Sequence, residues 1–109
     1  MSIQARYAVA VPNDDMSPRM CKDESVIFEK DRVPRADDDV VIVLSTGTYL
    51  IRELVGMNER DVHVRTYMPD ATAAISTNTV ANVYPIVQRC FCSLDELLAQ
   101  LELPECHHE

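Results

Sequence analysis

Short β-rich segments separated by polar stretches recur along the first half of the chain. Residues 7–11 (YAVAV) form the first such segment and residues 25–29 (SVIFE) the second. Residues 31–39 (DRVPRADDD) are polar and contain a proline, which predicts a loop. Residues 40–44 (VVIVL) are a continuous apolar run, a pattern typical of a strand that is buried on both faces. We therefore expect strands over most of this half.

The second half continues the same pattern with hairpins. Residues 45–48 (STGT) predict a tight turn, and residues 48–54 (TYLIREL) are its returning strand. Residues 61–67 (DVHVRTY) alternate with a period of two, so His63 should face away from its valine neighbours and toward solvent. Residues 80–92 predict the last strand, in which Pro85 should mark a bulge or an edge position.

Two further stretches are predicted to be irregular. Gly56 and Asn58 indicate a turn within the sequence VGMNER. Residues 68–79 (MPDATAAISTNT) are predicted to form a loop. Together these expectations describe a mostly β fold whose strands are mainly antiparallel.

One helix is predicted, at residues 94–103. Ser93 followed by Glu96 is a capping box, and Pro104 ends the helical pattern. One apolar stripe consists of Leu94, Leu97, Leu98 and Leu101. This stripe must be buried, either against the chain's own sheet or against a partner protein.

Composition and charge limit the class of protein. A chain of 109 residues with 47% hydrophobic residues fits one domain over residues 1–109, with a core at about residues 7–92. The net charge of -8 makes direct nucleic-acid binding unfavourable. No apolar run approaches the length of a membrane span, and no signal peptide is evident, so a cytoplasmic location is expected.

The cysteines are expected to be free thiols in that location. Cys90, Cys92, Cys106, His107 and His108 could in principle supply zinc ligands. Their spacing lacks the paired ligands of known zinc sites, and the alternative is that the strand cysteines are small core residues. We predict no metal site and no cofactor.

The stretch NDDMSPRM after the first strand, together with the order of the later elements, resembles the LexA/UmuD-like self-cleaving peptidase domain. This is the C-terminal domain of LexA and of temperate-phage CI-type repressors. The family has a Ser-Met-x-Pro turn, a Gly-Asp-x-Val-Val strand, a lysine-bearing hairpin, an Asn-Pro-x-Tyr-like loop and a final strand. The corresponding stretches, between about Val9 and Phe91, are DDMSP, DESVIFEKD, ADDDVVIVLSTGTYLIREL, DVHVRTYMPDATAAI and VYPIVQRCF. The resemblance implies a curved antiparallel β-clip fold over this part of the chain, and the C-terminal helix predicted from the leucine pattern follows it.

The resemblance places Asp15 at the family's serine and Arg52 at its lysine. Arginine cannot act as the base because its guanidinium stays protonated, so the domain should be catalytically inactive. Asp15 and Arg52 could instead form a bidentate ion pair. The alternative is that Arg52 faces solvent or pairs with Glu53, Glu29 or another carboxylate. Ser17 precedes a proline, and its hydroxyl is expected to bond the turn backbone rather than act as a nucleophile.

The resemblance implies an oligomerisation domain of a phage-type transcriptional repressor, a homodimer or a higher even oligomer. DNA would be bound only through a separate helix-turn-helix domain, since no tandem helical pattern precedes residue 93. Release would depend on an antirepressor or another regulatory protein. The alternatives are a stand-alone regulator that binds a repressor or host protein, and an active self-cleaving serine peptidase. The predicted interface residues are Val83, Tyr84, Ile86, Val87, Phe91, Leu94, Leu97, Leu98 and Leu101.

Overall fold

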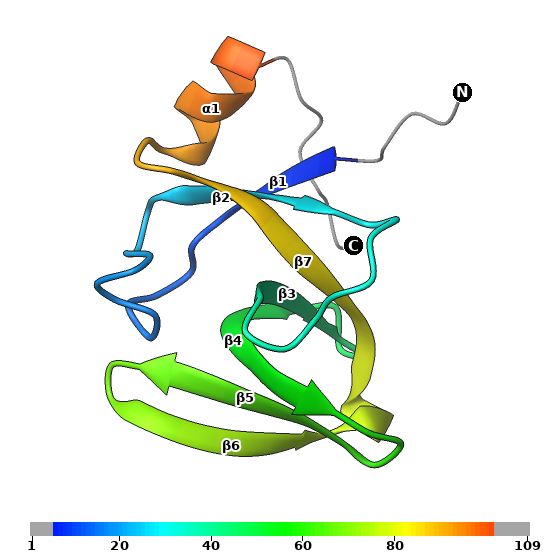
Figure 1. The fold of residues 1–109 in the computed structure, drawn as a ribbon. Helices are drawn as coiled ribbons and strands as arrows, with labels where there is room; N and C mark the ends of the chain where they lie inside the picture. The colour runs from blue at the N-terminus through cyan, green and yellow to red at the C-terminus, as the bar shows by residue number, and fades with distance from the viewer. Residues whose placement is uncertain (1–5, 102–109) are drawn as a thin grey trace.

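The computed structural model describes residues 6–101, which form a seven-stranded antiparallel sheet and one α-helix (Figure 1). The strands are β1 (Arg6–Ala10), β2 (Ser25–Glu29), β3 (Asp39–Leu44), β4 (Tyr49–Met57), β5 (Asp61–Tyr67), β6 (Asp70–Ser76) and β7 (Val80–Cys90). A 3-10 turn at Thr77–Thr79 precedes β7, and the helix α1 spans Leu94–Leu101. The prediction of a mostly β antiparallel domain with a C-terminal helix is confirmed.

The long strand β7 joins the two halves of the sheet, whose strand order is β1-β2-β7-β3-β4-β5-β6. Its first half pairs with β3 as far as Pro85, which lies opposite Val40. Its second half pairs with β2 from Ile86, opposite Phe28, and the register shifts between Ile27 and Phe28. Pro85 is therefore in a central strand, directly before the register shift of β7 between Ile86 and Gln88, so of the two predicted positions it is the one next to a bulge that fits. Proline lacks an N–H donor, and it is accepted here because β7 passes at this point from pairing with β3 to pairing with β2.

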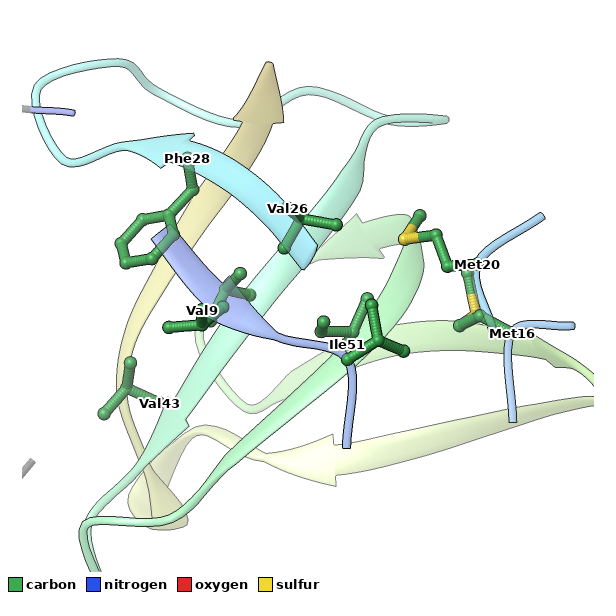
Figure 2. Close-up of a cluster of buried hydrophobic side chains, with 9 residues drawn as sticks. Val9, Met16, Met20, Val26, Phe28, Val43 and Ile51 are labelled. Atoms are coloured by element: carbon green, nitrogen blue, oxygen red, sulfur yellow. The ribbon is translucent and has the colours of Figure 1, made fainter. Parts of the chain in front are cut away.

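Three clusters of buried side chains stabilise the sheet. The largest contains Val9, Val26, Phe28 and Ile51 from the strands, together with two methionines from the loop between β1 and β2. These are Met16 and Met20, each only 1% exposed, and Figure 2 shows them beside Ile51. The loop is thus anchored by the hydrophobic effect before any of its polar contacts are considered. A second cluster lies among β3, β4 and β5.

The helix packs on the chain's own sheet. Leu97 is 2% exposed and belongs to a third cluster with Ala8 of β1 and Ile27 of β2. Leu94 and Leu98 pack against the same cluster. The Ser93 hydroxyl accepts a hydrogen bond from the Glu96 N–H at 3.3 Å, as the capping pattern predicts. The side chain of Leu101 lies outside the described residues.

Residues 68–79 are not the loop that the sequence predicts. They contain β6, which pairs with β5 along its whole length from Asp61↔Ser76 to Tyr67↔Asp70. The segment ATAAIS has small side chains with little β propensity, so its strand conformation results from hairpin pairing with β5. Only residues 68–69 form the turn.

The other predicted turns are partly confirmed. Gly47 has φ +93, and its N–H donates to the Leu44 carbonyl at 2.9 Å, as expected for the tight turn at residues 45–48. Gly56 is not a turn residue, because β4 continues to Met57 after a register shift between Leu54 and Gly56. His63 is exposed, as predicted. No helix within residues 6–101 is long and apolar enough to cross a bilayer.

Candidate functional site

The loop between β1 and β2 is closed by hydrogen bonds within itself. The Val11 N–H donates to the Glu24 carbonyl at 2.8 Å, and the Asp23 N–H donates to the Val11 carbonyl at 3.2 Å. Carboxylates also accept from backbone donors, because Asp14 Oδ1 accepts from the Lys22 N–H at 2.8 Å. These bonds, with the two buried methionines, hold residues 11–24 in one conformation. We call this segment the β1–β2 loop.

Asp15 is positioned by main-chain contacts to the end of β5. Its carbonyl accepts from the N–H groups of Tyr67 at 2.9 Å and Met68 at 3.0 Å. These bonds place its side chain beside β4, where Oδ2 lies 3.2 Å from Nη2 of Arg52. The Arg52 side chain is 14% exposed and the Asp15 side chain 38% exposed. Two residues that are distant in sequence therefore form an ion pair at the surface of the domain.

The ion pair is simpler than the sequence analysis expects. Nη1 of Arg52 donates to the carbonyl of Ile51 at 2.8 Å, so the two arms of the guanidinium have different partners. The contact with Asp15 is therefore a single one and not the predicted bidentate fork. Within residues 6–101, Glu29 pairs with Arg6 and Arg32, and Glu53 pairs with Arg19 and Arg65, so Arg52 pairs with neither carboxylate.

A denser polar network lies next to this pair and is centred on Arg19 of the β1–β2 loop. Nη2 of Arg19 donates to Oδ2 of Asp39 at 2.7 Å, and Nη1 donates to the Tyr67 hydroxyl at 2.7 Å. Nη1 also lies 3.3 Å from Oε2 of Glu53, which accepts from the Tyr67 hydroxyl at 2.8 Å. Asp39 and Glu53 are adjacent because they are register partners in β3 and β4. We call these four residues the Arg19 network.

Arg65 extends the network toward β6. Its Nε and Nη2 donate to the two carboxylate oxygens of Asp70 at 3.0 and 3.1 Å, a bidentate pair. Its guanidinium also lies 4.7 Å from the ring centroid of Tyr67, while that of Arg19 lies 5.1 Å from the same ring. Both cations are thus placed to gain from the electron-rich face of the tyrosine.

Burial changes the protonation chemistry of the network. Desolvation raises the pKa of Asp39 above its ordinary value, although the attraction of Arg19 opposes the change. Oδ1 of Asp39 is buried and has no hydrogen-bond partner. Burial lowers the pKa of Arg19, but Asp39 and the hydrogen bond with Tyr67 raise it by more. Burial and the hydrogen bond to Glu53 raise the pKa of Tyr67. Arg19 is charged at any accessible pH, as arginines are, so it is a permanent cation beside the two carboxylates of the network.

Ser17 does not have the partner that the sequence predicts. Its hydroxyl lies 3.5 Å from Sγ of Cys21 and not against the turn backbone. The turn carbonyls are used by main-chain donors instead, since the Ser17 N–H itself binds the Asp14 carbonyl at 2.9 Å. Lysine, the residue type that serves as the base in the family that the sequence resembles, occurs only at positions 22 and 30. Nζ of Lys30 lies over the rings of Tyr7 and Tyr84, at 4.2 and 5.7 Å from their centroids.

The predicted interface residues of β7 contribute to the chain's own core. Val83 packs against the second cluster, Tyr84 and Ile86 against the first, and Val87 against the third. Phe91 differs from them, because it is 79% exposed.

The cysteines and histidines that the sequence analysis considered and rejected as zinc ligands lie only partly within the described residues. Cys90 and Cys92 pack as partly buried side chains on the third cluster. Burial raises the pKa of the Cys90 thiol, and the neighbouring Cys92 adds to the effect. Cys106, His107 and His108 lie outside the described residues, and residues 6–101 contain no group of three or more candidate metal ligands.

The sequence analysis identifies Asp15 and Arg52 but misses Arg19, Asp39 and Tyr67. A signal for Asp39 exists, because the predicted hairpin makes it the register partner of Glu53. Arg19 has no such signal, since only the folded loop brings it there. Comparison of the chain with protein-family models found no match, and comparisons with curated proteins and with solved structures found no significant match.

Proposed function

We propose that this chain is a non-catalytic relative of the LexA/UmuD-like peptidase domain and serves as an oligomerisation and interaction module of a phage-type transcriptional repressor. In this role it brings together copies of a protein whose separate helix-turn-helix domain binds DNA. The resemblance in the sequence motifs leads to the proposal, and the antiparallel β architecture with a C-terminal helix is compatible with it.

The contact between Asp15 and Arg52 is the observation that carries the proposal. The resemblance assigns these positions to a nucleophile and its base, which must touch for catalysis. They lie 3.2 Å apart although one is in the β1–β2 loop and the other is on β4. The contact supports the proposal because the resemblance predicts it for two positions that are distant in the sequence.

The chemistry of the pair explains why a relative of a peptidase would be inert. The guanidinium of Arg52 holds its proton at any accessible pH and cannot accept one from a nucleophile. A carboxylate that is paired with this cation is also a poor nucleophile, because its negative charge is already neutralised. In this chain, the two positions that the resemblance assigns to peptide cleavage thus form an ion pair between the β1–β2 loop and the sheet.

The inactivity is tested by incubating the purified chain at alkaline pH and measuring its mass. We expect the mass to stay unchanged. A fragment pair would favour the active peptidase instead.

The assignment of the two positions is tested with a serine-reactive fluorophosphonate probe. We expect the Asp15→Ser/Arg52→Lys double variant to be labelled at position 15. The matched control, Asp15→Ser alone, should be labelled much more slowly because it lacks the base. Equal labelling of the two variants would remove the support that the resemblance gives.

One observation favours a second candidate function, a stand-alone regulator that binds a repressor or host protein. Phe91 is 79% exposed and lies between β7 and α1, where the sequence analysis places a protein interface. A Phe91→Ser variant distinguishes the two candidates. It leaves self-association unchanged if Phe91 serves only a foreign partner, whereas weakened self-association would assign Phe91 to the oligomer.

A further inference from the structure

The two edges of the sheet differ in their protection. At one edge, Ala8 and Val9 of β1 are 0% and 3% exposed, and α1 packs on the cluster that contains Ala8. At the other edge, five consecutive residues from Asp70 are exposed, and within residues 6–101 no strand pairs with the outer side of β6. Figure 1 shows β6 at the end of the fold that is remote from α1.

The β6 edge lacks the usual features that prevent strands from pairing with other chains. Residues 71–76 (ATAAIS) contain no charged residue, no proline and no glycine. Natural edge strands are commonly protected by lysines, prolines, bulges or a covering element. The one charge on β6 is Asp70, which its bidentate contact with Arg65 neutralises. The edge is therefore neutral in a chain of net charge -8.

The pairing of β5 determines which main-chain groups of β6 point outward. The Tyr67 N–H donates to the Asp15 carbonyl and not to β6. Because main-chain groups alternate along an antiparallel strand, Thr66 and Val64 face β6 and bond Ala71 and Ala73. The N–H and C=O groups of the intervening residues, Thr72 and Ala74, then point away from the sheet.

We infer that β6 pairs in an antiparallel manner with β6 of a second copy of this chain, across a two-fold axis at Ala73. This inference rests on the proposed function, for which it supplies the contact between copies. In this register Thr72 of one copy exchanges hydrogen bonds with Ala74 of the other, so outward-facing groups meet outward-facing groups. The same surface serves both copies, as a two-fold dimer requires.

Charge and side-chain size favour a second copy as the occupant. In this register Asp70 lies opposite Ser76 of the second copy, so the two aspartates never face each other. The alanines on both faces leave room for a close approach.

Sedimentation over a range of concentrations tests the inference on the purified chain. We expect the wild type to form a dimer. Ala73→Lys puts two ammonium groups opposite each other on the axis and should raise the dimer Kd by about tenfold or more. The matched control is Ala99→Lys, which adds the same charge at an exposed position of α1 and should leave the Kd unchanged.

The outcomes separate the two proposals. If Ala73→Lys dimerises as well as the control, the β6 contact is wrong while the oligomerisation role stands. If the wild type is monomeric at every concentration, the oligomerisation role itself fails. A second measurement does not depend on the lysine variant folding. Ala73→Cys should form a disulfide between copies on mild oxidation, detected as a peptide linked to itself through residue 73, whereas Ala71→Cys should not. Equal cross-linking of the two cysteine variants would overturn the register.

Discussion

Among the described residues, ion pairs attach the β1–β2 loop to the sheet at two places of different character. The Arg19 network joins four side chains, and the carboxylates of Asp39 and Glu53 are only 11% and 13% exposed. The Asp15–Arg52 pair is a single contact of 3.2 Å whose carboxylate is 38% exposed. In the Arg19 network, side-chain partners take the place of water around two nearly buried carboxylates. In the Asp15–Arg52 pair, water competes with Arg52 for the more exposed carboxylate of Asp15.

This difference predicts that the residues at positions 15 and 52 can be substituted without loss of the loop conformation. A single ion-pair contact whose carboxylate is open to solvent contributes little to stability. The position of the loop depends instead on Met16 and Met20, on main-chain bonds and on the Arg19 network. The side chains at positions 15 and 52 therefore contribute little to the stability of the fold that positions them.

The largest effect is expected for Arg19→Met, which keeps the apolar stem of the side chain and removes the guanidinium. Asp39 and the Tyr67 hydroxyl then lose a charged partner in a mostly buried place, which should lower the free energy of unfolding by about 1–3 kcal/mol. Urea unfolding measures the loss. Arg35→Met at an exposed loop position is the control, with an expected change within about 0.5 kcal/mol. Equal effects of the two variants would mean that the network does not hold the loop.

A smaller effect is expected for Tyr67→Phe, which removes one hydroxyl and keeps the ring below Arg19 and Arg65. The loss of the bonds to Arg19 and Glu53 should cost about 0.5–1.5 kcal/mol in urea unfolding. Tyr67→Leu also removes the aromatic face and should cost more. If the phenylalanine variant is as stable as the wild type, the hydroxyl does not link the two charges.

A still smaller coupling is expected between Asp15 and Arg52. A double-mutant cycle with Asp15→Ala and Arg52→Met isolates the pair from the other effects of each substitution. The coupling energy should be about 0.2–1 kcal/mol and should decrease in high salt. A coupling larger than the loss for Arg19→Met would reverse the comparison between the two attachments.

The last prediction concerns the dependence of stability on pH. Because the folded pKa of Asp39 is raised above its ordinary value of 3.8, the native state binds this proton more tightly than the unfolded chain does. The contribution of Asp39 is complete below that value and is lost as the pH rises through the raised pKa. Asp39→Asn removes this loss, so its stability relative to the wild type should increase over that window in urea unfolding. A relative stability that falls over the window would contradict the burial of the charge.

Local pattern predicted those elements whose apolar residues decide their structure. The run VVIVL became β3, the alternation in DVHVRTY became β5, and the leucine stripe became α1. Local pattern did not predict the strand in ATAAIS, because this strand is formed by pairing with β5 and not by burial of its own side chains. For Pro85 the sequence predicted a bulge or an edge, and the structure has the residue in a central strand next to a register shift, where β7 passes from β3 to β2.

By itself the sequence determined the residue types at positions 15 and 52, and with them the absence of a base at Arg52, because the guanidinium holds its proton in any surroundings. It also determined the periodicity that makes the domain a β sheet with one helix. Only the tertiary structure decided which charges meet. Arg19, Asp39 and Tyr67 come from three separate segments, and their contacts exist because the methionines of the β1–β2 loop are buried against the sheet. Tertiary structure also left β6 exposed, since α1 packs at the opposite edge.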